Sequence, residues 1–325
     1  MILRTGTAPV STVAGRVSHH VRKRDHSRVP SVEVIYAGSP PSIPAAPPRA
    51  SSCAPASDGG AATALVDALL STTRRLGTWD RPAPHGVGGG TNLVAFSGGV
   101  DSSLVAALVH GVSRSAPFRN DGHAAVAALG VGPALGAAQR SFAAEVAGHI
   151  GIDLVEVHTE EGTDQGYVAN EGTACYHCKT HLYGALSAIS LHATSIGGGG
   201  DVVMFNGTNA DDASDPTRVG LIAAAEFRVA SPLASIDKLL VRDASRHLGL
   251  PNWDHASSPC LRSRLAIGVK ATKEHLLRVE RAEGFVRESL GLGPGVDMRV
   301  RMLARGRAAV ELDGETLRRG GERAL

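Results

Sequence analysis

The segment Ser97-Gly98-Gly99-Val100-Asp101-Ser102 has the composition of a phosphate-binding loop. Glycines let a backbone come close to phosphate oxygens, serines add hydroxyl donors, and a following helix offers free N–H groups and a positive dipole end. The carboxylate of Asp101 fits such a site when a divalent metal such as Mg²⁺ bridges it to the phosphates. The chain contains neither GxxxxGKS nor GxxxxGKT, so the loop is not a Walker loop. A plain glycine-rich turn is the alternative.

A second polar segment, Asn206-Gly207-Thr208-Asn209-Ala210-Asp211-Asp212, follows the apolar run 202–205. Because it comes after a predicted strand, we expect it at the same sheet edge as the loop at residues 97–102. Asn, Gly and Asp also form ordinary turns, so the segment carries weight only together with that loop.

Three of the four cysteines are placed to do chemistry. Cys175 and Cys178 form a C-x-x-C pair, and Cys260 follows 82 positions after the second of them. Cys53 lies in a proline-rich stretch and is taken as incidental. Three interpretations of the trio stay open: buried structural thiols, a zinc site with His177 or His181 as fourth ligand, or an iron–sulfur site with one open iron.

The elements that must position these residues alternate between strand and helix. Short apolar runs predict strands at 93–96, 124–129, 154–157 and 202–205, and helical spacing predicts helices at 62–70, 102–110, 139–150 and 236–248. Gly111, Ser235 and Gly249 are the expected helix caps. This alternation predicts an α/β fold, a doubly wound parallel sheet of Rossmann type, with ligands at the carboxyl ends of the strands.

After about residue 265 the pattern changes. Thr272 is the expected cap of another helix, and residues 298–302 and 308–312 alternate as two half-buried strands around a turn at Arg305-Gly306. These elements predict a small C-terminal α+β unit.

Composition excludes several classes of protein. The 325 residues carry 33 Lys plus Arg and 31 Asp plus Glu, a net charge of +2, which makes nucleic acid an improbable partner. Four cysteines do not make a disulfide framework and favour a reducing compartment. Because the longest apolar stretch, 123–139, is too short and too rich in glycine to span a bilayer, we expect no membrane partner.

Residues 1–60 hold eight of the 17 prolines, and the first 30 residues hold six basic groups against one acid. This composition is typical of an organelle transit peptide followed by a proline linker, with an ordinary disordered tail as the alternative. The predicted location is therefore cytoplasmic or organellar.

The loop at residues 97–102 resembles the PP-loop of the N-type ATP pyrophosphatases, the superfamily of NAD and GMP synthetases and several tRNA sulfur-transfer enzymes. The resemblance implies that ATP is cleaved to AMP and pyrophosphate while a substrate oxygen is adenylated. It implies ATP binding by the residues of that loop and of the second polar segment, namely Ser97, Gly98, Gly99, Val100, Asp101, Ser102, Asn209 and Asp211.

Five further segments sharpen the resemblance: 175–179 (CYHCK), 207–212, 231–233 (SPL), 249–254 (GLPNWD) and 258–261 (SPCL). With the loop, and over roughly residues 62–313, they resemble the LarE family, sulfur transferases of nickel-pincer cofactor biosynthesis. The resemblance implies adenylation of a carboxylate of a pyridinium dicarboxylate mononucleotide, followed by its conversion to a thiocarboxylate.

The family has two variants, and each implies a role for the cysteines. In one, the cysteine matching Cys260 gives up its sulfur and becomes dehydroalanine. In the other, three cysteines, here Cys175, Cys178 and Cys260, hold a 4Fe-4S cluster that carries the sulfide. Arg299 and Arg301 match the family's substrate-phosphate arginines, and Arg264 is a further candidate partner of phosphate, although charged surface positions explain all three as well.

The chain departs from the family at Ala174, where Arg is usual, at Arg262, where a small residue is common, and in a short C-terminus. We predict a leader at 1–60, a PP-loop domain at 61–255, and a C-terminal sulfur-transfer domain at 256–325, incomplete relative to the family. The expected partner is a small nucleotide substrate, and a homo-oligomer is compatible with the family. The alternatives are a tRNA thiolase, an amidating synthetase, and a remnant that binds a nucleotide or metal without turnover.

Overall fold

A computed structural model describes residues 34–36, 59–81, 89–119, 121–195, 201–255, 259–293, 296–314 and 316. The predicted transit peptide and linker therefore lie mostly outside the described residues. Within the described segments, no helix combines the length and apolar character needed to cross a bilayer.

The elements in chain order are β1 (Val34–Tyr36), α1 (Gly59–Leu76), β2 (Thr91–Phe96), α2 (Val100–Arg114), β3 (Ala124–Val131), α3 (Ala137–Ile150), β4 (Asp153–His158), η2 (Glu161–Thr163), α4 (Gln165–Ala169), α5 (Ala174–Ser195), β5 (Val202–Phe205), α6 (Ala210–Ser214), α7 (Gly220–Glu226), α8 (Lys238–His247), η3 (Leu261–Arg264), α9 (Lys273–Leu290), β6 (Met298–Met302), η4 (Ala304–Gly306) and β7 (Ala308–Leu312).

The main sheet has the strand order β1-β4-β3-β2-β5. Strands β2 to β5 are parallel, and the short edge strand β1 pairs antiparallel with β4. The chain winds outward from β2 through β3 to β4 and then returns to place β5 on the other side of β2. This reversal creates a topological switch point between β2 and β5, the position where open α/β sheets bind ligands. The predicted doubly wound fold is confirmed.

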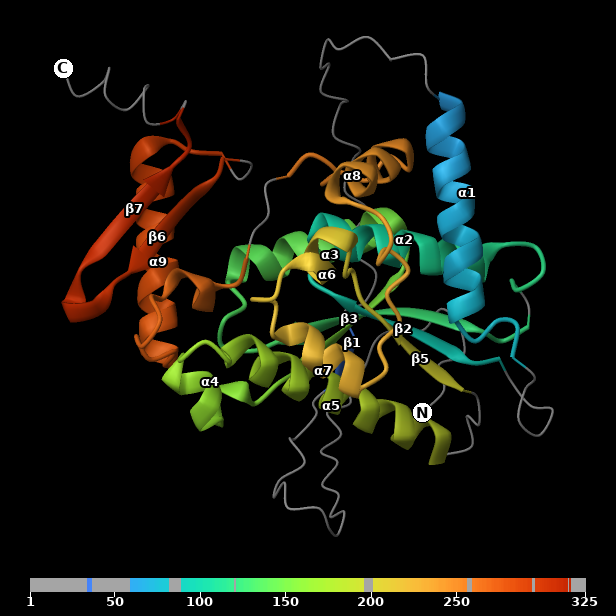
Figure 1. Ribbon diagram of the computed structural model, residues 1–325, viewed down its shortest axis with the longest axis horizontal. Coiled ribbons are helices and arrows are strands. Elements are labelled where there is room, and N and C mark those ends of the chain that lie inside the picture. The colour runs from blue at the N-terminus through green and yellow to red at the C-terminus, as the bar shows by residue number, and fades with distance from the viewer. Residues whose placement is uncertain are drawn as a thin grey trace, which may run out of the picture.

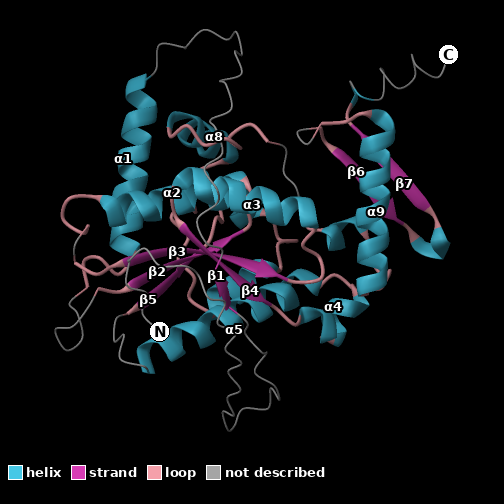
Figure 2. Cartoon of the chain, turned by 180° about the vertical axis from the view of Figure 1, so that it is seen from behind, coloured by secondary structure: helices cyan, strands magenta, loops and turns pink. Residues whose placement is uncertain are grey.

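Helices cover both faces of the sheet (Figures 1 and 2). Alternate residues of β2 point to opposite faces, as the strand period of two requires. Val94 and Phe96 pack in a core with α1, α2, α3 and α8, whereas Leu93 and Ala95 pack in a second core with α5 and α7. Both faces are therefore largely apolar, which leaves the strand ends as the place for a polar site.

The C-terminal part packs α9 against the antiparallel β6–β7 hairpin, beside the sheet (Figure 1). Its small core joins Leu276 and Val279 of α9 to Leu261 and Leu265 around η3 and to Tyr167 of α4. Glu280 of α9 accepts a hydrogen bond from the backbone N–H of Ala137, at 2.6 Å, and so caps the start of α3. These contacts anchor α9 beside the carboxyl edge of the sheet.

Two predicted helix caps are wrong. Helix α2 runs through Gly111 to Arg114, because Val112 still packs into the core. The cap of α8 is Asp237, whose side chain accepts from the N–H of Leu240, instead of Ser235. Gly249 does follow that helix in a left-handed conformation, and Thr272 caps α9 as expected.

Candidate active site

The loop between β2 and α2 is folded tightly on itself. Gly98 has a φ of +73°, and a Cβ there would come within 2.8 Å of the Ala143 Cα, so the position demands glycine. The Ser102 hydroxyl accepts from the N–H of Ser97 at 3.2 Å and donates to the carbonyl of Gly99 at 3.0 Å. Among the described residues, no side chain caps the N-terminus of α2. Its first-turn N–H groups can therefore bind an anion.

The second polar segment meets this loop at the switch point. The Asn209 amide donates to Asp101 Oδ1 at 2.9 Å, and the Lys238 ammonium forms an ion pair with Asp101 Oδ2. The N–H of Lys238 donates to the Asp211 carboxylate at 3.0 Å. A Cβ on Gly207 would lie 2.7 Å from the Ser102 nitrogen, so the two loops are in direct contact. The structure thus brings three distant segments of the chain around one carboxylate.

Two residues without a predicted role support this centre. Lys238 places a positive charge beside the loop, where phosphate oxygens would need one. Asn252 is fully buried and donates to the Gly98 carbonyl at 2.8 Å and to the Ser103 hydroxyl at 2.9 Å. Asn252 lies in the quoted GLPNWD segment, which signalled its importance but not its partners.

The three cysteines lie near the carboxyl ends of β3 and β4. Cys175 and Cys178 open α5, and Cys260 directly precedes Leu261, whose N–H bonds to the Ala134 carbonyl beyond β3. Cys175 and Cys260 are exposed, while Cys178 is partly buried. Burial raises the pKa of the Cys178 thiol to about 12, with Glu161 Oε1 4.0 Å from its sulfur adding to the effect. Cys178 is therefore a neutral thiol at physiological pH.

Arg262 lies among the cysteines. Its guanidinium donates to the Cys175 sulfur at 2.7 Å and to the Asn170 side chain at 3.2 Å. Burial would lower the pKa of Arg262, but the charges of Cys175 and Cys260 outweigh burial and raise it. The departure from a small residue at this position thus supplies a cation to the sulfur-bearing loop. Sequence reasoning noted the departure without finding this role.

The donors do not converge as metal ligands in this arrangement. Within the described parts of the chain, no group of three or more His, Cys, Asp or Glu residues is placed to hold a metal ion. His177 and His181, the candidate fourth ligands for zinc, both bond to Asp164, at 3.0 and 3.2 Å. The structure thus supports a shared neighbourhood for the three cysteines.

The predicted phosphate arginines face protein groups. Arg264 is 5% exposed; its Nε bonds to Glu283 at 2.9 Å, and its Nη1 bonds to the carbonyls of Pro259 and Cys260. Arg301 bonds to Glu311 at 2.5 Å and to the Ser263 carbonyl at 3.1 Å. Arg299 forms an ion pair with Asp297, at 3.3 Å, and makes a second contact of 3.5 Å with the same carboxylate. Of the three guanidiniums, that of Arg299 is the least engaged by the protein.

Comparison with known proteins agrees with this fold. The family model described as asparagine synthase matches residues 91–213, which run from β2 into α6. The uncharacterized protein slr1717 of Synechocystis is 40% identical over 197 residues, covering 60% of this chain and 68% of that protein. The pyridinium-3,5-bisthiocarboxylic acid mononucleotide synthase of Lactiplantibacillus plantarum is 29% identical over 200 residues, covering 61% of this chain and 67% of the synthase.

A solved structure, the U34-tRNA thiolase NcsA of Methanococcus maripaludis with its 4Fe-4S cluster, is 15% identical and has a TM-score of 0.40. The likeness covers 70% of this chain and 75% of the thiolase. At that similarity the thiolase's cluster and substrate say nothing of this chain.

The sheet order, the loop and the family match define an α/β protein of the PP-loop class. Within that class, the chain belongs to the same family as slr1717, and its similarity to the pyridinium-3,5-bisthiocarboxylic acid mononucleotide synthase supports the resemblance to the LarE family. Both resemblances drawn from the sequence are confirmed. Membership supports an enzyme that uses ATP and Mg²⁺ and transfers sulfur, as the general class of activity.

Proposed function

We propose that this protein is an ATP-dependent sulfur transferase of LarE type, acting on a pyridinium dicarboxylate mononucleotide in nickel-pincer cofactor synthesis. It adenylates a carboxylate of the substrate, releases pyrophosphate and produces a thiocarboxylate. The observation that carries the proposal is the meeting of the 97–102 loop with Asn209, Asp211 and Lys238 around Asp101, at the same sheet edge as the exposed thiols.

In the first half-reaction, a carboxylate oxygen of the substrate attacks the α-phosphorus of ATP. The bond from that phosphorus to the bridging oxygen breaks, and pyrophosphate leaves with the electron pair. The N–H groups at the start of α2 bind the phosphate oxygens, and Lys238 offsets the charge of the leaving group. Asp101, with Asp211 nearby, would hold Mg²⁺, which supplies charge neutralisation on the phosphates when bound.

In the second half-reaction, sulfur displaces AMP from the acyl adenylate. Cys260 is the proposed nucleophile because its thiol is exposed and lies beside Arg262, whereas the Cys178 thiol stays protonated. After AMP leaves, loss of the Cys260 Cα proton and cleavage of its Cβ–S bond release the thiocarboxylate and leave dehydroalanine. A 4Fe-4S cluster on the three cysteines is the alternative source of sulfur.

We propose that the C-terminal unit, made of α9 and the β6–β7 hairpin, binds the phosphate of the substrate. Arg299 and Arg301 lie on one face of β6, as the family pattern implies, and Arg264 is the further candidate. We propose Arg299 as the first contact, because within the described chain its guanidinium bonds only to Asp297, in an ion pair of 3.3 Å.

The test is to incubate the purified chain with ATP, Mg²⁺ and the pyridinium dicarboxylate mononucleotide. Pyrophosphate release and a thiocarboxylate product are expected, with Cys260 losing the mass of hydrogen sulfide. Asp101→Asn should abolish pyrophosphate release, whereas Cys260→Ala should retain it and lose the product. The matched variant Cys178→Ser should keep the mass change at Cys260. Stoichiometric iron and acid-labile sulfide, lost in Cys260→Ala, would instead establish the cluster route, and absence of pyrophosphate release would overturn the proposal.

A further inference from the structure

The backbone carbonyl oxygen of Cys260 accepts hydrogen bonds from three donors. The Ser263 N–H lies 3.0 Å from it, the Ser263 hydroxyl 2.7 Å, and Arg264 Nη1 3.3 Å. A carbonyl oxygen has two lone pairs, so three donors exceed what a neutral carbonyl needs. The same oxygen with a negative charge on it would use all three. The donors are therefore arranged as an oxyanion hole around a carbonyl of the protein itself.

The two donors of Ser263 follow from the local structure. Its N–H makes the first bond of η3, the short helix whose N-cap is Cys260. Serine hydroxyls reach the carbonyl three residues back elsewhere as well, as Ser115 reaches that of Val112 at 2.7 Å. The third donor is different, because Arg264 is a buried cation. A charged donor shielded from water stabilises negative charge far more than a neutral one.

Arg264 is fixed so that one end of its guanidinium faces this carbonyl. Glu283 binds its Nε at 2.9 Å and leaves Nη1 directed at the loop. Nη1 also donates to the Pro259 carbonyl and to the Ser263 hydroxyl, the latter at 3.3 Å. The two carbonyls bonded to Nη1 flank the Cys260 Cα. By holding the loop in this way, Arg264 keeps the peptide units on both sides of that Cα in one orientation.

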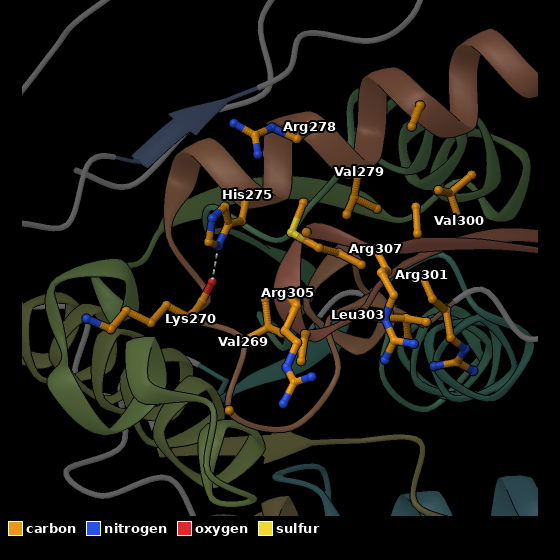
Figure 3. A pocket seen from close by; sticks show the side chains of 16 residues that line it. Val269, Lys270, His275, Arg278, Val279, Val300, Arg301, Leu303, Arg305 and Arg307 are labelled. Carbon is orange, nitrogen blue, oxygen red and sulfur yellow. Dashed lines mark hydrogen bonds between the residues drawn. The ribbon is translucent and has the colours of Figure 1, made fainter.

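Arg301 serves a different surface. It lines a cavity of about 460 Å³ between α9 and the β6–β7 hairpin, together with Val300 and Arg307 (Figure 3). Arg264 is not among the residues that line this cavity. The two arginines therefore act at different places, and the guanidinium of Arg264 is committed to the loop that carries Cys260.

We propose that Ser263 and Arg264 stabilise the enolate that forms when Cys260 loses its Cα proton, which rests on the single-cysteine route of the proposed function. Solvent water takes the proton, because Cys260 is exposed. The electron pair of the Cα–H bond moves onto the carbonyl oxygen. It then returns to form the Cα=Cβ bond while the Cβ–S bond breaks. The thiocarboxylate leaves with the electron pair of that bond, and dehydroalanine remains at position 260.

The donors act on a charge that exists only in this step. The Cα–H group of a peptide is a very weak acid, so the elimination is slow unless the enolate is stabilised. Adenylation of the substrate and attack by the Cys260 sulfur place no charge on the Cys260 carbonyl. Loss of a donor should therefore slow the release of the thiocarboxylate and leave the two earlier steps intact.

The test uses the full-length protein and α,α′-dibromoadipamide, which alkylates a thiol twice to give a cyclic sulfonium. Loss of that group removes the same Cα proton and yields dehydroalanine, with neither ATP nor substrate. Peptide mass spectrometry follows the loss at each cysteine. Elimination should be faster at Cys260 than at Cys175, which is also exposed but lies in α5. Ser263→Ala should slow elimination at Cys260 at least about tenfold and leave that at Cys175 unchanged.

Three further variants separate the donors from an effect on folding. Ser263→Thr keeps the hydroxyl and should eliminate like the parent. Ser115→Ala removes the same local serine bond at the end of α2 and should also match the parent. Arg264→Met/Glu283→Leu removes the cationic donor without leaving a buried charge, and it should slow elimination at Cys260 at least as much as Ser263→Ala. The proposal is overturned if the parent eliminates equally fast at both exposed cysteines, or if Ser263→Ala and Ser115→Ala have equal rates.

Incubation with ATP, Mg²⁺ and the proposed substrate separates this inference from the proposed function. Ser263→Ala should still release pyrophosphate but accumulate the thioester on Cys260, seen as a gain of acyl mass on the intact protein. The parent should pass on to dehydroalanine. Thioester loss that is equally fast in both proteins would overturn the inference. Absence of pyrophosphate release from the parent would count against the proposed function alone, because the alkylation assay needs no ATP.

Discussion

The buried ion pair between Arg264 and Glu283 should govern the stability of the loop that carries Cys260. Their side chains are 7% and 14% exposed, with 2.9 Å between Arg264 Nε and Glu283 Oε1. Removing one member of such a pair costs about 3–5 kcal/mol, because the other charge stays buried. After Arg264→Met, the one bond left to Glu283 among the residues that the structure describes would be that from the Val300 N–H, at 3.1 Å. We expect Arg264→Met to lose about 3–5 kcal/mol of unfolding free energy and Glu283→Leu about 3 kcal/mol.

The double variant Arg264→Met/Glu283→Leu separates the charge effect from packing. Because no buried charge is left, its unfolding free energy should lie within about 1–2 kcal/mol of that of the parent. The loss in the double variant would then be smaller than the sum of the two single losses by at least about 3 kcal/mol, which is the coupling energy of the pair. Urea unfolding of the four proteins, followed by circular dichroism, measures this cycle. Additive losses, or single losses below about 0.5 kcal/mol, would refute the reasoning. The KM of a folded double variant also tests the assignment of Arg264 to substrate phosphate: a large rise supports it, and an unchanged value limits Arg264 to holding the loop.

Three further predictions follow from local geometry. Gly98→Ala should lower the free energy of unfolding in urea by about 2–3 kcal/mol, because it adds left-handed strain and a clash with α3. Gly99→Ala, whose new Cβ would have only a 3.5 Å contact with Ser97, should lower it much less. Equal losses in the two variants would contradict this. At pH 8 a thiol of pKa about 12 is ionised to about 10⁻⁴, so mass spectrometry should find Cys178 the slowest of the described cysteines to react with iodoacetamide. Asp164→Ala should cost about 1–2 kcal/mol at pH 7, because Asp164 caps α4. Hydrogen bonds, that of His181 foremost, outweigh burial and lower the Asp164 pKa, so the difference from the parent should vanish as pH falls through and below about 4.

The parts of the site that the sequence predicted are local in sequence. The loop at 97–102 and the segment at 206–212 each combine a strand end with residues of special backbone or charge, and that combination is visible in a short window. The parallel order of the strands then forces both to one edge. The alternation of strands and helices was equally visible, because both faces of the sheet are buried and leave continuous apolar runs.

The parts that it missed depend on packing between distant segments. Lys238 reaches Asp101 across 137 positions, and Asn252 reaches the Gly98 carbonyl across 154. No local pattern marks either contact. Arg264 is a residue whose burial the sequence did not indicate. An arginine in a loop is expected to face solvent, but α9 places Glu283 against Arg264 and both side chains are buried.

The position of Arg262 bears on how the sulfur is delivered. A cluster needs three thiolates that all bind one inorganic core. In this structure the Cys175 sulfur instead accepts a hydrogen bond from the Arg262 guanidinium. Of the two proposed routes, a single reacting Cys260 is the one that gives Arg262 a role, because the charge of Cys260 is among those that raise the Arg262 pKa and the guanidinium would stabilise a Cys260 thiolate before attack. Arg262→Ala would then slow thiocarboxylate formation while leaving pyrophosphate release intact, because the loop at 97–102 lies at a different strand end. If Arg262→Ala instead gains iron in an anaerobic preparation, the guanidinium is what keeps the three thiols from acting together as ligands.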